Sequence, residues 1–125
     1  MIEWKKEYSI DVPQIDEEHK TLIKSLNEFY EGLRINSSKE NLDILIQRLL
    51  KYAESHFSNE EKYMQSINYQ NIEEHSKEHK EFMSKANDFY EKFRSGKMMV
   101  SFEVTNFIKD WIVHHILNED MKLKN

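Results

Sequence analysis

The sequence contains no cysteine, and only two glycines and one proline among its 125 residues. The absence of cysteine excludes disulfide bonds, thiolate metal ligands and cysteine nucleophiles, and it fits a reducing compartment. Sheets joined by tight turns usually need more glycine and proline, so the composition favours an all-helical fold. No apolar run exceeds three residues. We therefore expect neither a membrane span nor a secretory signal, and we predict a cytoplasmic protein.

The sequence also has fewer basic than acidic residues. The 18 lysines and arginines are outnumbered by 23 aspartates and glutamates, which gives a formal net charge of −5. Because no local basic patch stands out, we do not expect binding of nucleic acid. The length suits a single domain over residues 1–125. What the sequence does hold is six histidines, and their placement decides the interpretation.

The first half of the chain predicts an arm followed by two amphipathic helices. Residues 1–14 are irregular and form the arm. Apolar residues then recur at steps of three and four over 15–34, which predicts the first helix. Ser37 with Glu40 three residues later resembles a capping box, and it would start a second helix that reaches about Gln65.

The second half predicts two more helices. Asn71 would cap the third, Gly96 would end it, and the fourth would begin near Ser101. Short connections favour antiparallel neighbours. Residues 15–122 are therefore predicted to form an up-down-up-down four-helix bundle.

Six ionisable side chains fall on the apolar stripes of these helices. They are His19, His56, Glu60, His75, His79 and His115. A single buried histidine is more often a hydrogen-bonded core residue than a ligand. Six such groups without partners would cost about 1–3 kcal/mol each, against a total domain stability of roughly 5–15 kcal/mol. A bound metal would remove this cost by using the lone pairs, so we interpret the set as a metal site.

The spacing of these residues supports one shared site. His56 and Glu60 are four residues apart, as are His75 and His79, which stacks each pair on one helix face. Antiparallel alternation brings both pairs, and the first and last histidines of the set, to the same end of the bundle. Five nitrogens and a carboxylate exceed the tetrahedral set of zinc. They suit two iron ions bridged by carboxylates.

A second bridging carboxylate has two candidates, Glu119 and Asp120. A regular helix favours Glu119, four residues after His115. A step of five residues turns through roughly 500° and leaves Asp120 about 140° away around the helix. Spacing alone therefore leaves two alternatives: a regular helix with Glu119 as the bridge, or a distorted helix with Asp120.

Four motifs resemble those of the hemerythrin family, in its single-domain bacterial form. They are IDEEH at 15–19, HFSNEE at 56–61, HSKEH at 75–79, and the segment 111–120. The match covers nearly the whole chain. In the family an aspartate ligand lies five residues after the last histidine, so the resemblance implies that Asp120 is the second bridge.

The resemblance further implies a pair of irons that binds dioxygen reversibly, for carriage, storage or sensing. One iron would be held by His75, His79 and His115 and the other by His19 and His56, with an oxo or hydroxo group, Glu60 and Asp120 bridging them. The two-histidine iron would keep an open position for dioxygen.

Apolar walls are expected around that open position, because a dry pocket would slow oxidation of the irons. The candidates are Leu22, Phe57, Trp111 and Ile112. The same four residues could equally be ordinary core packing, and the two roles are compatible.

Three polar residues near the motifs are interpreted as outside the site. Asp16 would either orient the ring of His19 or cap the first helix. His114 and Glu61 are rotated off the apolar stripes, so both are expected to face solvent.

A di-iron enzyme acting on peroxide, nitric oxide or an oxidisable substrate is the alternative function. A ferritin-like oxidase needs two Glu-x-x-His motifs and a zinc peptidase needs His-Glu-x-x-His, and the sequence has neither. A metal-free helical module that binds a partner would leave the buried histidines unexplained. We expect a monomer, because no apolar face remains once the bundle is built.

Overall fold

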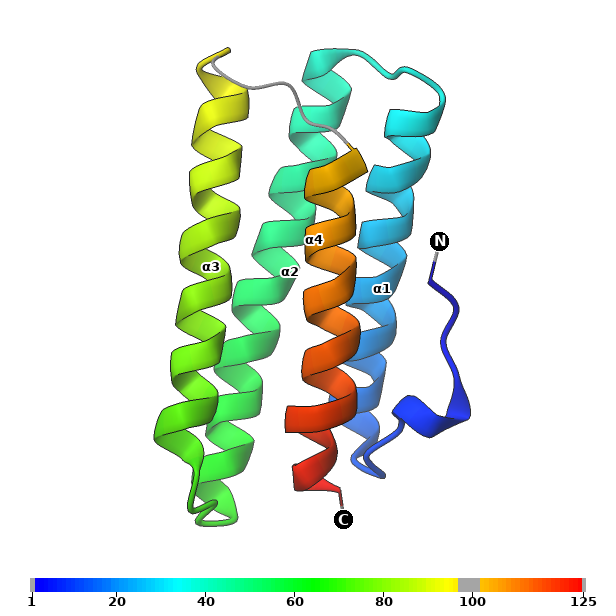
Figure 1. The fold of residues 1–125 in the computed structure, drawn as a ribbon. Coiled ribbons are helices and arrows are strands. Elements are labelled where there is room, and N and C mark those ends of the chain that lie inside the picture. Colours follow the sequence, from blue (N-terminus) through cyan, green and yellow to red (C-terminus); the bar gives the residue numbers. More distant parts are fainter. Residues whose placement is uncertain (1, 97–101, 125) are drawn as a thin grey trace.

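The computed structural model describes residues 2–96 and 102–124, in which four long helices form an antiparallel bundle (Figure 1). The elements are the 3₁₀ turn Lys6–Tyr8, α1 (Pro13–Arg34), α2 (Lys39–Ser66), α3 (Ile72–Arg94), α4 (Phe102–His114), the π-helical turn His115–Glu119 and the 3₁₀ turn Asp120–Leu123. Helices α1 and α3 run in one direction, and α2 and α4 in the other, which confirms the predicted fold class. Over the described ranges, no helix has the length and hydropathy needed to cross a bilayer.

The turn between α1 and α2 differs from the predicted capping box. Asn36 is left-handed (φ 56°), and the Ser37 N–H donates to the Gly32 carbonyl at 2.9 Å. Ser37 is thereby used to end α1. Ser38 caps α2 instead, and its hydroxyl accepts a hydrogen bond from the Asn41 N–H at 3.1 Å. The prediction put the cap one residue too early because it did not consider how the preceding helix ends.

The ends of α3 follow the prediction more closely. Asn71 is the N-cap residue, although its side chain makes no capping hydrogen bond. Gly96 has φ 79°, a left-handed conformation that suits glycine, and its N–H donates to the Phe93 carbonyl. The prediction that Gly96 ends this helix is confirmed. Ser101, the expected start of the fourth helix, lies outside the described residues.

The N-terminal arm packs along α1. It is irregular apart from its 3₁₀ turn, and α1 begins at Pro13, two residues earlier than predicted. The Asn27 amide holds the arm through both of its polar atoms. Its Nδ2 donates to the Ile2 carbonyl at 2.7 Å, and its Oδ1 accepts from the Ile2 N–H at 3.0 Å.

Asp16 fastens the other end of the arm. Its carboxylate accepts hydrogen bonds from the Ser9 hydroxyl and from the Ile10 N–H, the latter at 3.0 Å. Both roles considered for it from the sequence, orienting His19 and capping α1, are therefore wrong. Asp16 is already the fourth residue of α1, so its carboxylate reaches back to the preceding chain instead of to the first turn.

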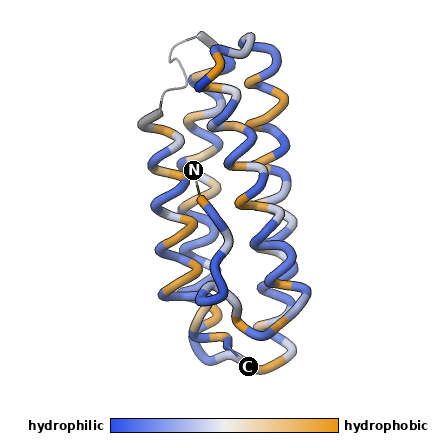
Figure 2. The backbone as a smooth tube through the Cα atoms, turned by 90° about the vertical axis from the view of Figure 1, so that its right-hand side faces the viewer, coloured by the Kyte–Doolittle hydropathy of each residue, from blue (hydrophilic) through white to orange (hydrophobic). Residues whose placement is uncertain are grey.

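Hydrophobic residues recur along every helix (Figure 2). The main hydrophobic core fills the half of the bundle nearest the α1–α2 turn. Its most buried members include Leu26, Phe29, Ile46, Leu49 and Ile108. A smaller apolar cluster closes the opposite end, where the arm, the end of α2 and the C-terminal segment meet; its buried members are Ile10, Ile15, Met64 and Leu123. Between the two clusters lies a polar layer, and this layer holds the site.

Candidate metal centre

The polar layer contains every residue predicted to bind metal. His19 lies on α1, His56 and Glu60 on α2, His75 and His79 on α3, and His115 and Asp120 just beyond α4. Each of the seven is at most 3% exposed. The four helices therefore bring the predicted set together inside the bundle.

The π-helical turn after α4 places Asp120, and not Glu119, in the polar layer. A π-helix bonds residues five apart, so the fifth residue after His115 returns to the same face. Asp120 Oδ1 accordingly lies 3.0 Å from His115 Nε2. Glu119 is on the outside and pairs with Lys122. The expectation from a regular helix fails because the helix is distorted at this point.

The carboxylate of Glu60 contacts rings on both sides of the layer. Its Oε1 lies 2.7 Å from His75 Nε2 and 3.1 Å from His79 Nε2. Its Oε2 lies 3.2 Å from His56 Nε2. One carboxylate thus offers a different oxygen to each of two groups of imidazoles.

The two carboxylate oxygens of Asp120 also contact different groups of rings. Its Oδ1 lies 3.0 Å from His75 Nε2, and its Oδ2 lies 2.9 Å from His19 Nε2. The donor atoms form two compact sets: Glu60, His75, His79, His115 and Asp120 in one, and His19, His56, Glu60 and Asp120 in the other. Both carboxylates belong to both sets.

The hydrogen bonds of the cluster are incomplete, and this observation tests whether the residues fit a metal. His19 Nε2 and Asp120 Oδ2 are close to each other, yet neither makes a hydrogen bond to any described residue, and Glu60 Oε2 also lacks a hydrogen-bond partner there. Buried donors and acceptors left in this state are costly. Imidazole and carboxylate donors that crowd together and leave several of their atoms without a hydrogen bond suit a shared divalent cation, so the residues fit a metal site.

Burial and charge act in opposite directions on the rings. Burial lowers the pKa of His56, but neighbouring carboxylates outweigh it and raise the pKa to about 9. The same balance raises the pKa of His75 to about 9 and that of His115 to about 10. Burial raises the pKa of Glu60, but the histidines hold it well below its usual range. These carboxylates therefore attract positive charge, and a metal ion would displace the protons that His56, His75 and His115 hold without it.

Three glutamates omitted from the predicted site contact the outer nitrogens of the rings. Glu18 lies 2.8 Å from His56 Nδ1, Glu61 lies 3.6 Å from His79 Nδ1, and Glu78 lies 3.4 Å from His115 Nδ1. In each case the glutamate on one helix reaches a ring on the next helical segment along the chain. A hydrogen-bonded partner such as Glu18 orients the ring and increases its basicity. Glu61 is farther away, and among the described residues His79 Nδ1 has no hydrogen-bond partner.

These contacts correct one expectation and show which signal was missed. Glu61 is half-buried against His79 and does not simply face solvent. Each of the three glutamates is adjacent in the sequence to a residue of the cluster, as Glu18 is to His19. Adjacent helical residues are rotated by about 100°, which turns the neighbour from the bundle axis toward the next helix. His114 is exposed, as predicted.

A small cavity adjoins the rings of His19 and His56. All four predicted wall residues, Leu22, Phe57, Trp111 and Ile112, line it. Its volume is about 10 Å³, which is room for about one water molecule. The walls also pack on the site from the other side, since the Phe57 ring stacks on His79 with centroids 4.0 Å apart.

Fold and donor set together define a helical-bundle protein with a buried cation-binding centre. Residues 11–125 match the family described as "Hemerythrin HHE cation binding domain". The chain belongs to the hemerythrin family.

Individual relatives agree with this assignment. The chain is 35% identical to the bacteriohemerythrin of Clostridium acetobutylicum over 96% of each chain. It is 31% identical to the myohemerythrin of Theromyzon tessulatum, with 98% of this chain and 90% of that protein covered. A crystal structure of wild-type hemerythrin matches with a TM-score of 0.94 at 26% identity, covering 99% of this chain and 95% of that one.

Proposed function

We propose that this protein binds dioxygen reversibly at a non-haem di-iron centre, for carriage, storage or sensing. One observation carries the proposal. Five imidazoles and two shared carboxylates converge beside an apolar cavity of about 10 Å³. Membership of the hemerythrin family supports the same function.

The two sets of donor atoms suggest how a pair of irons would be held. One iron would take His75, His79 and His115 and the other His19 and His56, with Glu60 and Asp120 bridging both. When bound, the pair would supply the electrons that reversible binding of dioxygen requires. The two-ring set offers fewer protein donors, which leaves room there for an external ligand, on the side where the cavity lies.

The walls of the cavity would serve this function by excluding water. Leu22, Phe57, Trp111 and Ile112 present hydrocarbon and aromatic surface next to the two-ring set. A dry environment limits loss of bound ligand and oxidation of the metal by solvent and anions. The volume also argues against the alternative function on an organic substrate, because an oxidisable organic molecule is much larger than one water.

Reversibility is the decisive test. Metal-free protein loaded with ferrous iron under anaerobic conditions is expected to bind about two irons per chain, one for each donor set. A visible absorption band should form in air and disappear under vacuum through repeated cycles. Irreversible bleaching, with turnover of added peroxide or nitric oxide, would instead support the enzyme.

A further inference from the structure

The centre is closed to a hydrated ion. Each proposed ligand is at most 3% exposed, and the adjoining cavity has a volume of only about 10 Å³. A metal ion must therefore cross the wall of the bundle and exchange its water for protein donors on the way. A route requires oxygen donors at the surface and a ligand ring directly behind them.

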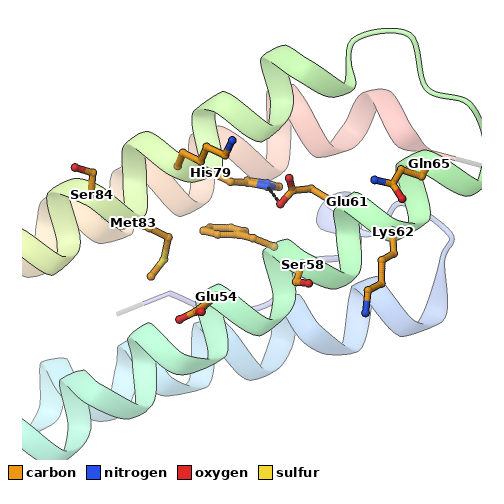
Figure 3. A pocket seen from close by; sticks show the side chains of 10 residues that line it. Glu54, Ser58, Glu61, Lys62, Gln65, His79, Met83 and Ser84 are labelled. Atoms are coloured by element: carbon orange, nitrogen blue, oxygen red, sulfur yellow. Dashed lines mark ion pairs between the residues drawn. The ribbon is translucent and has the colours of Figure 1, made fainter.

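A groove between α2 and α3 has both features (Figure 3). Its volume is about 650 Å³, and the ring of His79 forms part of its lining although His79 is only 2% exposed. Within the part of the chain that the structure describes, His79 Nδ1 makes no hydrogen bond. It faces Glu61 Oε2 at 3.6 Å, and Figure 3 shows the Glu61 side chain directed at this ring.

Oxygen donors follow one face of α2 along the groove. They are Glu54, Ser58, Glu61 and Gln65, spaced at helical steps of three and four residues. Oxygen ligands hold divalent ions less firmly than the imidazoles of the centre hold iron, so the donors strengthen from surface to interior. Lys62 and Lys80 also line the groove, but the ammonium end of Lys62 points away from Glu61 (Figure 3).

A second groove, of about 340 Å³ between α1 and α2, reaches His56. Its inner carboxylate is fixed, because Glu18 accepts hydrogen bonds from His56 Nδ1 and from the Asn59 amide, both at 2.8 Å. Among the described residues, Glu61 contacts His79 at 3.6 Å, which is longer than either contact of Glu18. A carboxylate without a fixed partner can take up an ion and release it again.

We propose that the α2–α3 groove is the route by which ferrous ions enter and leave the centre, and that Glu61 passes each ion from the oxygen donors of the groove to the donors behind the His79 ring. The inference rests on the proposed function in that it takes the centre to bind metal.

Uptake of cobalt(II) by metal-free protein tests this route without iron or dioxygen. Association is followed by stopped-flow absorption, release by transfer to a chelator, and affinity by titration. Glu61→Gln is expected to slow uptake and release by the same factor, about tenfold. The affinity should stay unchanged, because Glu61 is not hydrogen-bonded to the His79 ring and acts only on the path. Ser58→Phe, which narrows the groove without touching a ligand, should act in the same direction. Glu17→Gln, the same charge change in the second groove, is the control and should match the wild type.

Three results would overturn the route: wild-type uptake rates in both groove variants, equal slowing by Glu17→Gln, or a weaker affinity for Glu61→Gln at an unchanged uptake rate. The last would mean that Glu61 only orients His79. Because dioxygen takes no part, these results leave the proposed function standing. Failure of reversible dioxygen binding would likewise leave the cobalt measurements valid.

Discussion

The half of the bundle nearest the α1–α2 turn is filled by hydrocarbon, whereas the layer nearer the α2–α3 turn is filled by imidazole and carboxylate. The same four helices build both. Leu26 and Phe29 lie on the stripe of α1 that also carries His19, two turns earlier, and Leu49 and His56 share a stripe of α2 in the same way. All of these side chains are almost completely buried.

The difference lies in what each half needs in order to be stable. Buried hydrocarbon contributes free energy in proportion to the area removed from water, whatever the pH or the metal supply. Buried imidazoles and carboxylates contribute only while protons or metal ions complete them. The apolar half therefore supports the fold, and the polar layer makes stability conditional on a ligand.

The largest expected effect comes from removing one ring of the polar layer. His75→Ala should abolish stoichiometric iron loading, because His75 Nε2 lies within 3.0 Å of both shared carboxylates. Loss of a ligand should exceed the roughly 10–100-fold loss of affinity typical of outer-sphere changes. Iron per chain, measured after reconstitution and desalting, is the readout. His114→Ala, at the exposed neighbouring histidine, should load normally, and equal loss in both variants would refute the assignment.

The pH response should separate the polar layer from the rest of the fold. In the metal-free protein, pKa values raised from 6.5 to about 9 for His75 and about 10 for His115 mean that protonation stabilises the folded state. This contribution is complete below pH 6.5 and is lost as the pH rises through 9 to 10. The lowered pKa of Glu60 adds stability above its ordinary value of 4.5, which is lost in acid.

The free energy of unfolding of metal-free protein, from denaturant titrations, should therefore fall by several kcal/mol between pH 6.5 and 10. The iron-loaded protein should not lose stability over this range, because metal takes the place of the protons. Parallel pH curves for the two forms would contradict this account of the polar layer.

A cavity in the apolar half should have the opposite signature. Phe29→Ala removes a completely buried ring and should lower the free energy of unfolding by about 3–5 kcal/mol, equally in metal-free and loaded protein. Iron content should stay at the wild-type value. Ile44→Ala, at a side chain that is 56% exposed, is the control and should change stability by less than about 0.5 kcal/mol. Reduced iron loading in Phe29→Ala would show that the two halves are coupled.

The comparison also explains what the sequence could predict. The spacing of apolar residues and the composition were enough to predict four antiparallel helices, because the apolar face of each helix must be buried whichever helices pack against it. The histidines and Glu60 stood out because they interrupt those stripes. Position 120 needed the family resemblance, since a π-helical turn leaves no mark in the spacing rules of a regular helix.

The pattern of a single helix could not predict contacts with other segments of the chain. The N-cap moved from Ser37 to Ser38 because the end of α1 uses the Ser37 N–H. Asp16 accepts a hydrogen bond from the N-terminal arm, and Glu61 contacts His79 on the next helix. In each case the partner belongs to another segment, and a helical pattern describes only its own.

The smallest expected effect concerns Glu18, which contacts the outer nitrogen of the His56 ring and is not itself one of the seven proposed ligands. Its carboxylate holds His56 Nδ1 at 2.8 Å and is itself fixed by Asn59. Removing such a partner typically costs 10–100-fold in metal affinity, about 1.4–2.7 kcal/mol, because the ring loses orientation and basicity. We expect Glu18→Ala to weaken metal binding to this extent, measured by competition with a chelator, while the protein still folds and loads at high metal concentration.

Two variants separate the causes of that loss. Glu17→Ala removes the neighbouring carboxylate, which pairs with Lys20 at the surface and touches no ring, so its metal affinity should equal that of the wild type. Glu18→Gln keeps an oxygen that can accept from His56 but removes the charge, and its affinity should fall between the wild type and Glu18→Ala. If Glu18→Ala binds metal as tightly as Glu17→Ala, the outer glutamates do not support the rings, and the polar layer ends at the seven inner residues.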